Sequence, residues 1–259
     1  MREGPDRTRT APATQRYSGR RLTGRPRRGI VGGTLNEATR KILRRGRAAA
    51  MLLGAMIASR AFAADGAPII WRLDNLLAIG GVKPELWGAP RVTAEKAVRF
   101  NGVDDGVVLA VDPVAGWREF TIEALIRPDA TGEPEPRFFH VEDEQGHRAT
   151  LEIRLTADGR WALDTFLLAG DSHCTLLDRT RLHPAGRWTW VALRYDGRTM
   201  TSFVDGVEEL AGAVSVTPFA AGRTSLGVRL NRVDWYKGEI KEVRFHDRAL
   251  AAADLQRAR

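Results

Sequence analysis

The sequence has a single cysteine, Cys174, among its 259 residues. One cysteine excludes an intrachain disulfide, so the fold has to rest on its hydrophobic core. No signature of a catalytic or metal-binding thiol surrounds Cys174, and we interpret it as a buried or inert cysteine. Pairing between chains, or a nucleophilic role, is the alternative.

Long apolar segments are also missing, and the run Ala48–Ala58 is only 11 residues long. Such a run is too short to span a bilayer, so we predict no transmembrane segment in the mature chain. It follows the basic stretch Arg40–Arg47 and precedes Ala61-Phe62-Ala63, a small-x-small cleavage site. These three parts predict a secretory signal peptide over residues 38–63 and a secreted or periplasmic protein. A membrane anchor is the alternative, and Arg44-Arg45 leaves the choice between Sec and twin-arginine export open.

The positive charge is confined to one end of the chain. Residues 1–64 hold 15 Arg and Lys against 3 Asp and Glu, whereas the remainder holds 25 against 29. Residues 1–37 are Arg-rich with few large apolar side chains, and we predict a disordered leader there. A downstream start codon would leave this leader untranslated, and a basic nucleic-acid arm is the other alternative. The mildly acidic remainder argues against a nucleic-acid partner for the folded part.

From Ala67 onward the sequence alternates short strand patterns with tight turns. Phe120, Ile122, Ala124 and Ile126 fall on one face of a strand with a period of two. Asp-Gly pairs, which favour hairpin turns, punctuate the series. We expect strands over residues 69–73, 98–100, 107–111, 120–126, 151–155, 161–166, 190–195, 199–204, 207–210, 225–230 and 239–245. Without βα alternation, this pattern predicts an all-β fold, a two-sheet antiparallel sandwich with a short C-terminal helix over Leu250–Arg257.

Four segments resemble the LamG-like jelly-roll domains of the concanavalin A-like lectin/glucanase superfamily. They are Val98–Val107, Phe120–Pro128, Trp188–Gly197 followed by Phe203–Gly206, and Gly238–Leu250. The resemblance covers about residues 68–259, and we place the domain at 67–259. It implies a jelly-roll sandwich, but the superfamily includes lectins, adhesive modules and glycosidases, so the fold does not fix the function.

Asp104 and Asp105 occupy a turn near which members of this family often bind calcium. Calcium needs several oxygen ligands, so two carboxylates are only part of a site. The family commonly has Asp before the Glu of its last strand, whereas this chain has Lys241 there. The resemblance therefore implies calcium as a candidate cofactor at Asp104 and Asp105, and the alternative is that these residues cap the turn.

The loop Asn231–Lys237 combines aromatic and polar side chains. Glycan sites use an aromatic platform for the apolar sugar face and amide or carboxylate groups for the hydroxyls. Asn231, Asp234, Trp235 and Tyr236 are therefore the candidate ligand-binding residues. The alternative is that the aromatics simply pack against the sheet.

Catalytic patterns are missing from the sequence. Glucanase relatives carry catalytic carboxylates as Glu-x-Asp-x-Glu on one strand, and this chain has no such pattern. Glu142-Asp143-Glu144 is consecutive, so its side chains alternate faces, and we expect it at a hairpin tip. No H-E-x-x-H or G-x-S-x-G motif occurs.

We therefore predict a binding module rather than an enzyme, with a glycan as the expected partner. An adhesive or structural module that binds an extracellular protein is one alternative. A glycoside hydrolase with an unrecognised carboxylate pair is the other.

Overall fold

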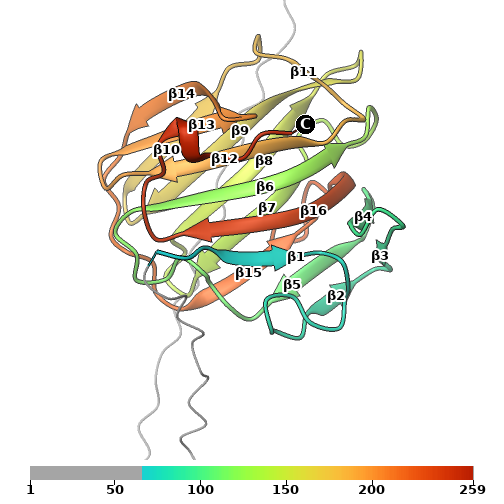
Figure 1. Cartoon of the computed structure of the whole chain (residues 1–259), viewed down its shortest axis with the longest axis horizontal. Helices are drawn as coiled ribbons and strands as arrows, with labels where there is room; N and C mark the ends of the chain where they lie inside the picture. The colour runs from blue at the N-terminus through green and yellow to red at the C-terminus, as the bar shows by residue number, and fades with distance from the viewer. Residues whose placement is uncertain (1–65, 259) are drawn as a thin grey trace, which may run out of the picture. The chain divides into compact units, whose positions relative to one another are not determined.

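The computed structural model describes residues 66–258, which form two antiparallel β-sheets packed face to face (Figure 1). Sheet 1 contains eight strands, in the order β14 (Val207–Ala213), β13 (Thr199–Val204), β12 (Thr189–Tyr195), β6 (Phe120–Pro128), β16 (Lys237–His246), β4 (Val98–Asn101) and β3 (Arg91–Val92), with β1 (Ile69–Arg72) paired to β16. The predicted leader and signal peptide lie outside the described residues.

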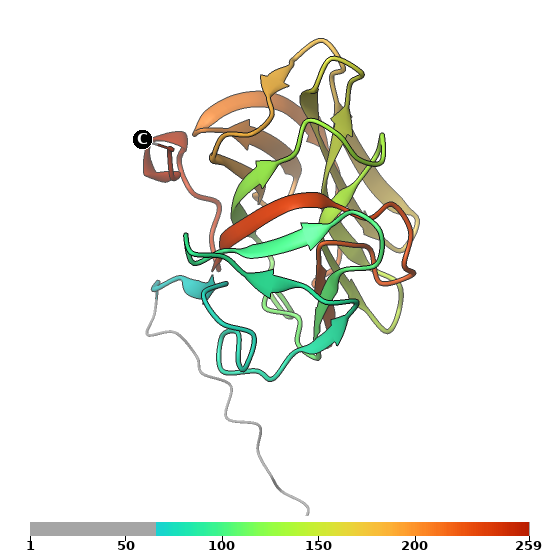
Figure 2. The same ribbon diagram turned by 90° about the vertical axis from the view of Figure 1, so that its right-hand side faces the viewer.

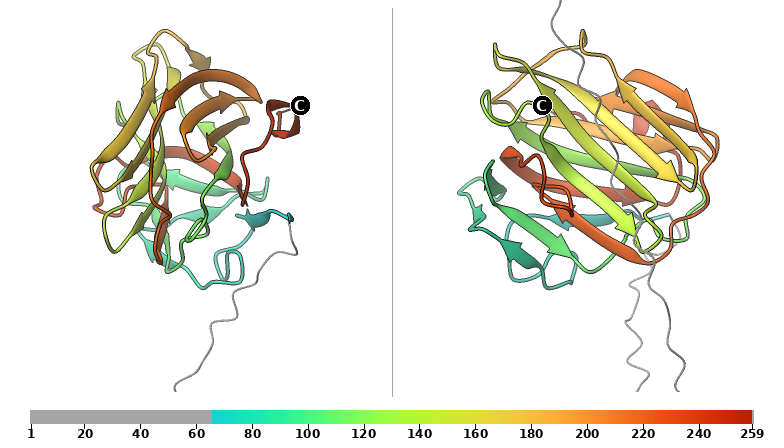
Figure 3. Two further views of the ribbon diagram at one scale, coloured as in Figure 1. Left: turned by 90° about the vertical axis from the view of Figure 1, so that its left-hand side faces the viewer. Right: turned by 180° about the vertical axis from the view of Figure 1, so that it is seen from behind.

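Sheet 2 also contains eight strands and forms the second layer, which faces the viewer in the right-hand view of Figure 3. Its order is β10 (Ser172–Leu177), β9 (Arg160–Ala169), β8 (Arg148–Leu155), β7 (Arg137–Asp143), β15 (Gly222–Leu226), β5 (Gly106–Leu109) and β2 (Glu85–Trp87), with β11 (His183–Pro184) paired to β9. The predicted two-sheet antiparallel sandwich is thus confirmed.

The hydrophobic core lies between the sheets and follows the period of two. Phe120, Ile122, Ala124 and Ile126 of β6 are all buried in it, as their spacing predicts. In β12 the residues Val191, Leu193 and Tyr195 do the same. Aromatic rings bridge the layers, and the ring of Phe139 on β7 lies 5.9 Å from that of Phe245 on β16 at an interplanar angle of 46°. The core therefore fixes which side chains of each strand point outward.

Strand β7 has no counterpart among the expected strands. Phe138 and Phe139 are adjacent yet both fully buried, because a register irregularity lies between Arg137 and Phe139. An irregularity of this kind interrupts the alternation of buried and exposed residues by which a strand is recognised in a sequence. The hairpin tip expected at Glu142-Asp143-Glu144 lies slightly later, because Glu142 and Asp143 still belong to β7 and only Glu144 and Gln145 form the turn.

The expected C-terminal helix is reduced to a single 3-10 turn, η1 (Ala252–Asp254). The backbone amides around it bond to side chains of the sheet instead of to a helix. Leu250 N–H donates to Thr121 Oγ1 at 3.0 Å, and Gln256 N–H donates to Glu123 Oε1 at 2.7 Å. The prediction of a helix over Leu250–Arg257 was wrong because these contacts hold the segment in an extended path.

This C-terminal segment covers part of the outer face of sheet 1 (Figure 2). Leu250 and Leu255 pack on Ala192 and Phe203, forming a second small apolar cluster. Glu123, only 1% exposed, is enclosed beneath the segment, and its Oε2 lies 3.0 Å from His246 Nε2. The two sheets thus differ, because part of the outer face of sheet 1 is occupied by the C-terminal segment.

Cys174 on β10 is a free cysteine that packs against the edge of the core. Burial raises the pKa of its thiol, which disfavours the reactive thiolate. Among residues 66–258 no helix is long and apolar enough to cross a membrane.

Asp112, in the loop after β5, is a buried acid that forms no ion pair with any cation in residues 66–258. It is 7% exposed, and its Oδ1 accepts a hydrogen bond from Val114 N–H at 2.8 Å. Burial, reinforced by the charge of Asp143, raises the pKa of Asp112 to about 7. The folded chain therefore holds a proton on Asp112 at pH values where the unfolded chain has released it.

We predict that stability falls as the pH rises from about 4 to about 7, and that Asp112→Asn removes much of this fall. Asparagine keeps the acceptor for Val114 but cannot ionise. At about pH 8 the variant should exceed the wild type in unfolding free energy by on the order of 3 kcal/mol, and at about pH 4 the two should agree. Urea unfolding at both pH values measures this. Asp171→Asn, at an exposed loop position, is the control, and equal pH profiles for Asp112→Asn and the wild type would contradict the assignment.

Candidate functional site

The outer face of sheet 2 carries polar side chains at every second position of the interior strand β8. Alternate residues of β8 point into the core: Ala149, Leu151 and Ile153. The residues between and beside them point to the outer face: Arg148, Thr150, Glu152 and Arg154. Strands β7, β9 and β10 add further polar groups beside these. Charged side chains are costly to bury unless they are paired, so a dense array of them on one sheet face points to a site.

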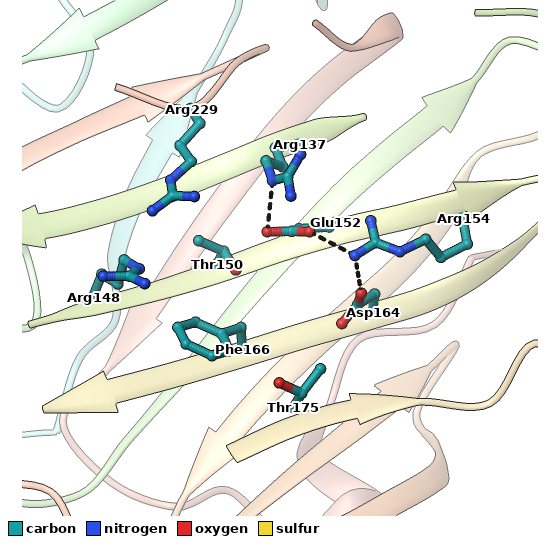
Figure 4. Close-up of a pocket in the computed structure, with 9 residues that line it drawn as sticks. All are labelled: Arg137, Arg148, Thr150, Glu152, Arg154, Asp164, Phe166, Thr175 and Arg229. Atoms are coloured by element: carbon teal, nitrogen blue, oxygen red, sulfur yellow. Dashed lines mark hydrogen bonds and ion pairs between the residues drawn. The ribbon is translucent and has the colours of Figure 1, made fainter. Parts of the chain in front are cut away.

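These side chains line a cavity of about 200 Å³ on the outer face of sheet 2, which we call the arginine pocket (Figure 4). The lining comes from four adjacent strands and one loop: Arg137 of β7, Arg148, Thr150, Glu152 and Arg154 of β8, Asp164 and Phe166 of β9, Thr175 of β10, and Arg229. With both acids ionised, the lining has two more cations than anions.

One end of the pocket is a chain of alternating charges (Figure 4). Arg137 Nε donates to Glu152 Oε1 at 3.0 Å, and Arg154 Nη2 donates to Glu152 Oε2 at 3.1 Å. The same Arg154 nitrogen also pairs with Asp164 Oδ2. Glu152 and Asp164 are register partners on β8 and β9, so strand pairing sets the two carboxylates side by side.

Asp164 is the acid most affected by this environment. It is 1% exposed, and burial raises the pKa of its carboxyl to about 6, although Arg154 opposes that rise. Within the described chain, Asp164 Oδ1 and the neighbouring Thr150 Oγ1 are buried without a hydrogen-bond partner. Buried polar atoms of this kind are uncommon, and both stand ready to bond a ligand hydroxyl.

The other end of the pocket holds Arg148, Arg229 and the half-buried ring of Phe166. The Arg148 guanidinium carbon lies 5.1 Å from the Phe166 ring centroid, within the range of a cation–π contact. Neither Arg148 nor Arg229 forms an ion pair with any carboxylate in residues 66–258. Figure 4 shows the two guanidinium groups on the same side of the pocket, away from the linked charges of Glu152 and Asp164.

Arg229 reaches the pocket from the loop 227–236, which joins β15 to β16. Gly227 N–H donates to Phe138 O at 3.0 Å, and Tyr236 N–H donates to Gly227 O at 2.9 Å, so the loop is closed at its base. Leu230 N–H donates to His140 Nδ1 at 3.2 Å, which holds the loop on the sheet. Hydrogen bonds of the loop's backbone amides, one of them to the His140 side chain, therefore place Arg229.

The four ligand-binding residues predicted in this loop take different places. Asn231 is exposed, Asp234 pairs with Arg137 at the margin of the pocket, and the half-buried Trp235 packs edge-on against Trp87 with ring centroids 6.4 Å apart. Tyr236 is fully buried in the core and offers no surface to a ligand, so we assign it to the core instead. The loop does meet the pocket, but through Arg229 and Asp234.

Asp104 and Asp105, the predicted calcium ligands, hold the turn together. Asp105 accepts Ala89 N–H on Oδ1 at 2.7 Å and Asn101 N–H on Oδ2 at 3.0 Å. Asp104 Oδ1 accepts a hydrogen bond from the Asn101 side-chain amide at 2.7 Å. Among residues 66–258 no three His, Cys, Asp or Glu side chains converge as a metal site. With both Asp105 oxygens engaged by backbone amides, the turn does not fit calcium as the resemblance implies.

Sequence reasoning missed most of the pocket because its residues come from four strands. Glu152 and Asp164 do not stand at alternate positions of one strand, because they pair across β8 and β9. The signal that was available is the run Arg148-x-Thr150-x-Glu152-x-Arg154, whose polar face alternates with apolar residues. Four strongly polar side chains along one face of a central strand suggest that this face is not covered by other parts of the chain.

Comparisons with known proteins agree with this architecture. The family model described as the concanavalin A-like lectin/glucanases superfamily matches residues 101–256. No curated protein matches the chain in sequence.

Several solved structures share the fold. Domain 4 of AbnA, an extracellular GH43 arabinanase from Geobacillus stearothermophilus in complex with arabinotriose, is 21% identical with a TM-score of 0.53, over 73% of this chain and 96% of that domain. The ligand-binding domain of botulinum neurotoxin serotype D, in complex with N-acetylneuraminic acid, is 12% identical with a TM-score of 0.55, over 72% of this chain and 48% of that domain. The chain thus spans about half the length of the toxin domain.

Gly227 offers a test of how the loop 227–236 is anchored. Its φ is +82°, and a Cβ added there would overlap the Phe100 ring. We predict that Gly227→Ala lowers the unfolding free energy by about 2–5 kcal/mol, the sum of backbone strain and overpacking. Gly170→Ala, at φ +59° with open space around it, isolates the backbone cost and should lose only about 1–2 kcal/mol. Urea unfolding checks both, and equal losses in the two variants would contradict the overlap.

Proposed function

Because this chain belongs to the concanavalin A-like lectin/glucanase superfamily, we propose that it is a secreted or periplasmic module that binds a saccharide in the arginine pocket. The observation that carries the proposal is the pocket itself, on the sheet face that the C-terminal segment does not cover. It brings the half-buried ring of Phe166 together with two buried polar atoms that have no hydrogen-bond partner among residues 66–258, Thr150 Oγ1 and Asp164 Oδ1.

The size of the pocket supports a saccharide held through one of its units. About 200 Å³ is less than the roughly 300–1,000 Å³ typical of sites that enclose a whole drug-sized ligand. A single sugar residue held in the pocket, with its neighbours lying along the sheet, is consistent with such dimensions. The arabinotriose and N-acetylneuraminic acid bound by the two structural neighbours support a saccharide as the ligand class.

A hydrolase is the second candidate, and the pair Glu152 and Asp164 favours it. Glycosidases typically use two carboxyl groups, one of which has a raised pKa, and Asp164, with a pKa of about 6, lies beside Glu152. However, Arg154 Nη2 contacts both carboxylates and fills the space between them. A glycosidic oxygen or an attacking water would need that space, so we favour binding without hydrolysis.

We predict that the full chain binds saccharides on a glycan array and that Phe166→Ala weakens the binding about tenfold by removing the apolar contact. Isothermal titration with the best saccharide from the array measures the affinity. Val207→Ala truncates an exposed apolar side chain on sheet 1 and should bind like the wild type. If no saccharide binds, or if Phe166→Ala binds unchanged, the pocket is not a saccharide site, and capture of a protein partner becomes the leading alternative.

Two further arms of the same assay separate the remaining proposals. Calcium assistance is tested with a chelator, and we expect unchanged affinity because Asp105 is engaged by backbone amides. A loss of binding that calcium restores would establish the metal. Release of reducing ends from the bound saccharide, abolished in Asp164→Asn and Glu152→Gln, would establish the hydrolase instead.

Export is proposed from the signal-peptide pattern over residues 38–63. If it is correct, mass spectrometry of the protein recovered from the periplasm or the medium will find a chain that begins at Ala64 or Asp65. Replacement of Leu52 and Leu53 by arginine interrupts the apolar run and should retain the protein in the cytoplasm. Recovery of an uncleaved chain from the cytoplasm of the unmodified strain would contradict the proposal.

A further inference from the structure

Arg148 and Arg229 differ from the other two arginines of the pocket. Arg137 is engaged by Glu152 and Asp234, and Arg154 by Glu152 and Asp164. Within the described residues, Arg148 donates only one long bond, of 3.4 Å, to Gly146 O, and Arg229 makes no side-chain hydrogen bond. Two half-buried guanidinium groups therefore enter the pocket without a carboxylate to neutralise them.

The two groups are also close enough to repel each other. Burial, and next the charge of Arg229, lower the pKa of Arg148. Glu142 is the register partner of Arg148 on β7 and lowers the repulsion between the two arginines. Its Oε2 nevertheless lies 3.2 Å from His140 Nε2, and among residues 66–258 it forms no ion pair with either arginine. An anion placed between Arg148 and Arg229 would relieve this repulsion and gain charge-assisted hydrogen bonds.

The rest of the pocket specifies what carries the anion. Beside the two guanidinium groups lie the Phe166 ring and the unpartnered Thr150 Oγ1, and further along lies the unpartnered Asp164 Oδ1 (Figure 4). A free inorganic anion would leave the Phe166 ring and these two polar atoms unused. A sugar ring that bears an acidic group would use both ends, with its hydroxyls toward Asp164 and its charge toward the arginines.

We infer that the arginine pocket selects an acidic saccharide and that Arg148 and Arg229 bind its carboxylate or sulfate group. This inference rests on the proposed saccharide-binding function and names the ligand class. Guanidinium forks match the planar carboxylate and the oxygens of sulfate in a bidentate manner, which lysine does not reproduce.

The test compares matched saccharides on the full chain. One pair is an oligogalacturonate and its carboxyl-reduced form, and the other is a sulfated oligosaccharide and its desulfated form. At low salt the acidic member of at least one pair should bind about tenfold tighter than its neutral partner, and the difference should shrink at high salt. Which pair responds tells carboxylate from sulfate.

Variants assign the effect to the two arginines. Arg148→Gln and Arg229→Gln should each weaken the acidic saccharide about tenfold while leaving the neutral form unchanged. Arg148→Lys keeps the charge and should recover only part of the affinity. Arg223→Gln removes the same charge from an exposed position of β15 outside this pocket and is the matched control, expected to bind like the wild type.

The outcomes separate this inference from the proposed function. Equal affinity for acidic and neutral members overturns the acidic specificity and leaves saccharide binding intact. Equal losses for Arg223→Gln and the pocket variants overturn the assignment to Arg148 and Arg229. If no saccharide of either form binds, both fall, and a thermal shift with inorganic sulfate that is lost in Arg229→Gln would show a site for small anions alone.

Discussion

The burial of Tyr236 between Phe100 and Phe138 is the interaction on which the site depends. Its ring is fully buried, with centroids 6.3 Å from Phe100 and 5.7 Å from Phe138. Burial of an aromatic side chain of this size contributes roughly 1.5–3 kcal/mol. Since Tyr236 ends the loop 227–236, its anchoring fixes where that loop returns to the sandwich. Arg229 and Asp234 then project onto sheet 2 from a loop with little freedom to move away.

The register of β7, β8 and β9 places the charged residues of the pocket side by side on the outer face of sheet 2. Glu152 pairs with Asp164 on one side and with Arg137 on the other, so three charged positions fall in one line across the sheet. A shift of one residue would turn these charges into the core and bring Leu151 or Ile153 to the surface. The hydrophobic core between the sheets therefore protects the arrangement of the polar face, although it touches none of the ligand-facing atoms.

The outer faces of the two sheets differ in role: the C-terminal segment packs on sheet 1, and the candidate binding pocket lies on sheet 2. On sheet 1 the C-terminal segment satisfies Glu123 and Thr121 and buries Phe203, so this region is structural. On sheet 2 the polar groups of the pocket satisfy each other only in part: among residues 66–258, Thr150 Oγ1 and Asp164 Oδ1 have no hydrogen-bond partner. Sheet 1 also keeps two such atoms, Arg194 Nε and His246 Nδ1, but they do not line the pocket. Unpartnered polar atoms that line a cavity are expected where their partner is a ligand.

Periodicity in the sequence determined the sheets, because the period of two in Phe120–Ile126 follows from strand geometry alone. It also determined the fold family, through motifs that mostly make turns and core contacts. It did not determine β7, because a register irregularity there breaks the period of two. It also did not determine the C-terminal turn, because backbone amides that a helix would use bond to side chains of sheet 1 instead. The candidate site was decided by the tertiary structure, since Arg137, Arg148, Glu152, Asp164 and Arg229 meet only through strand pairing and the closure of one loop.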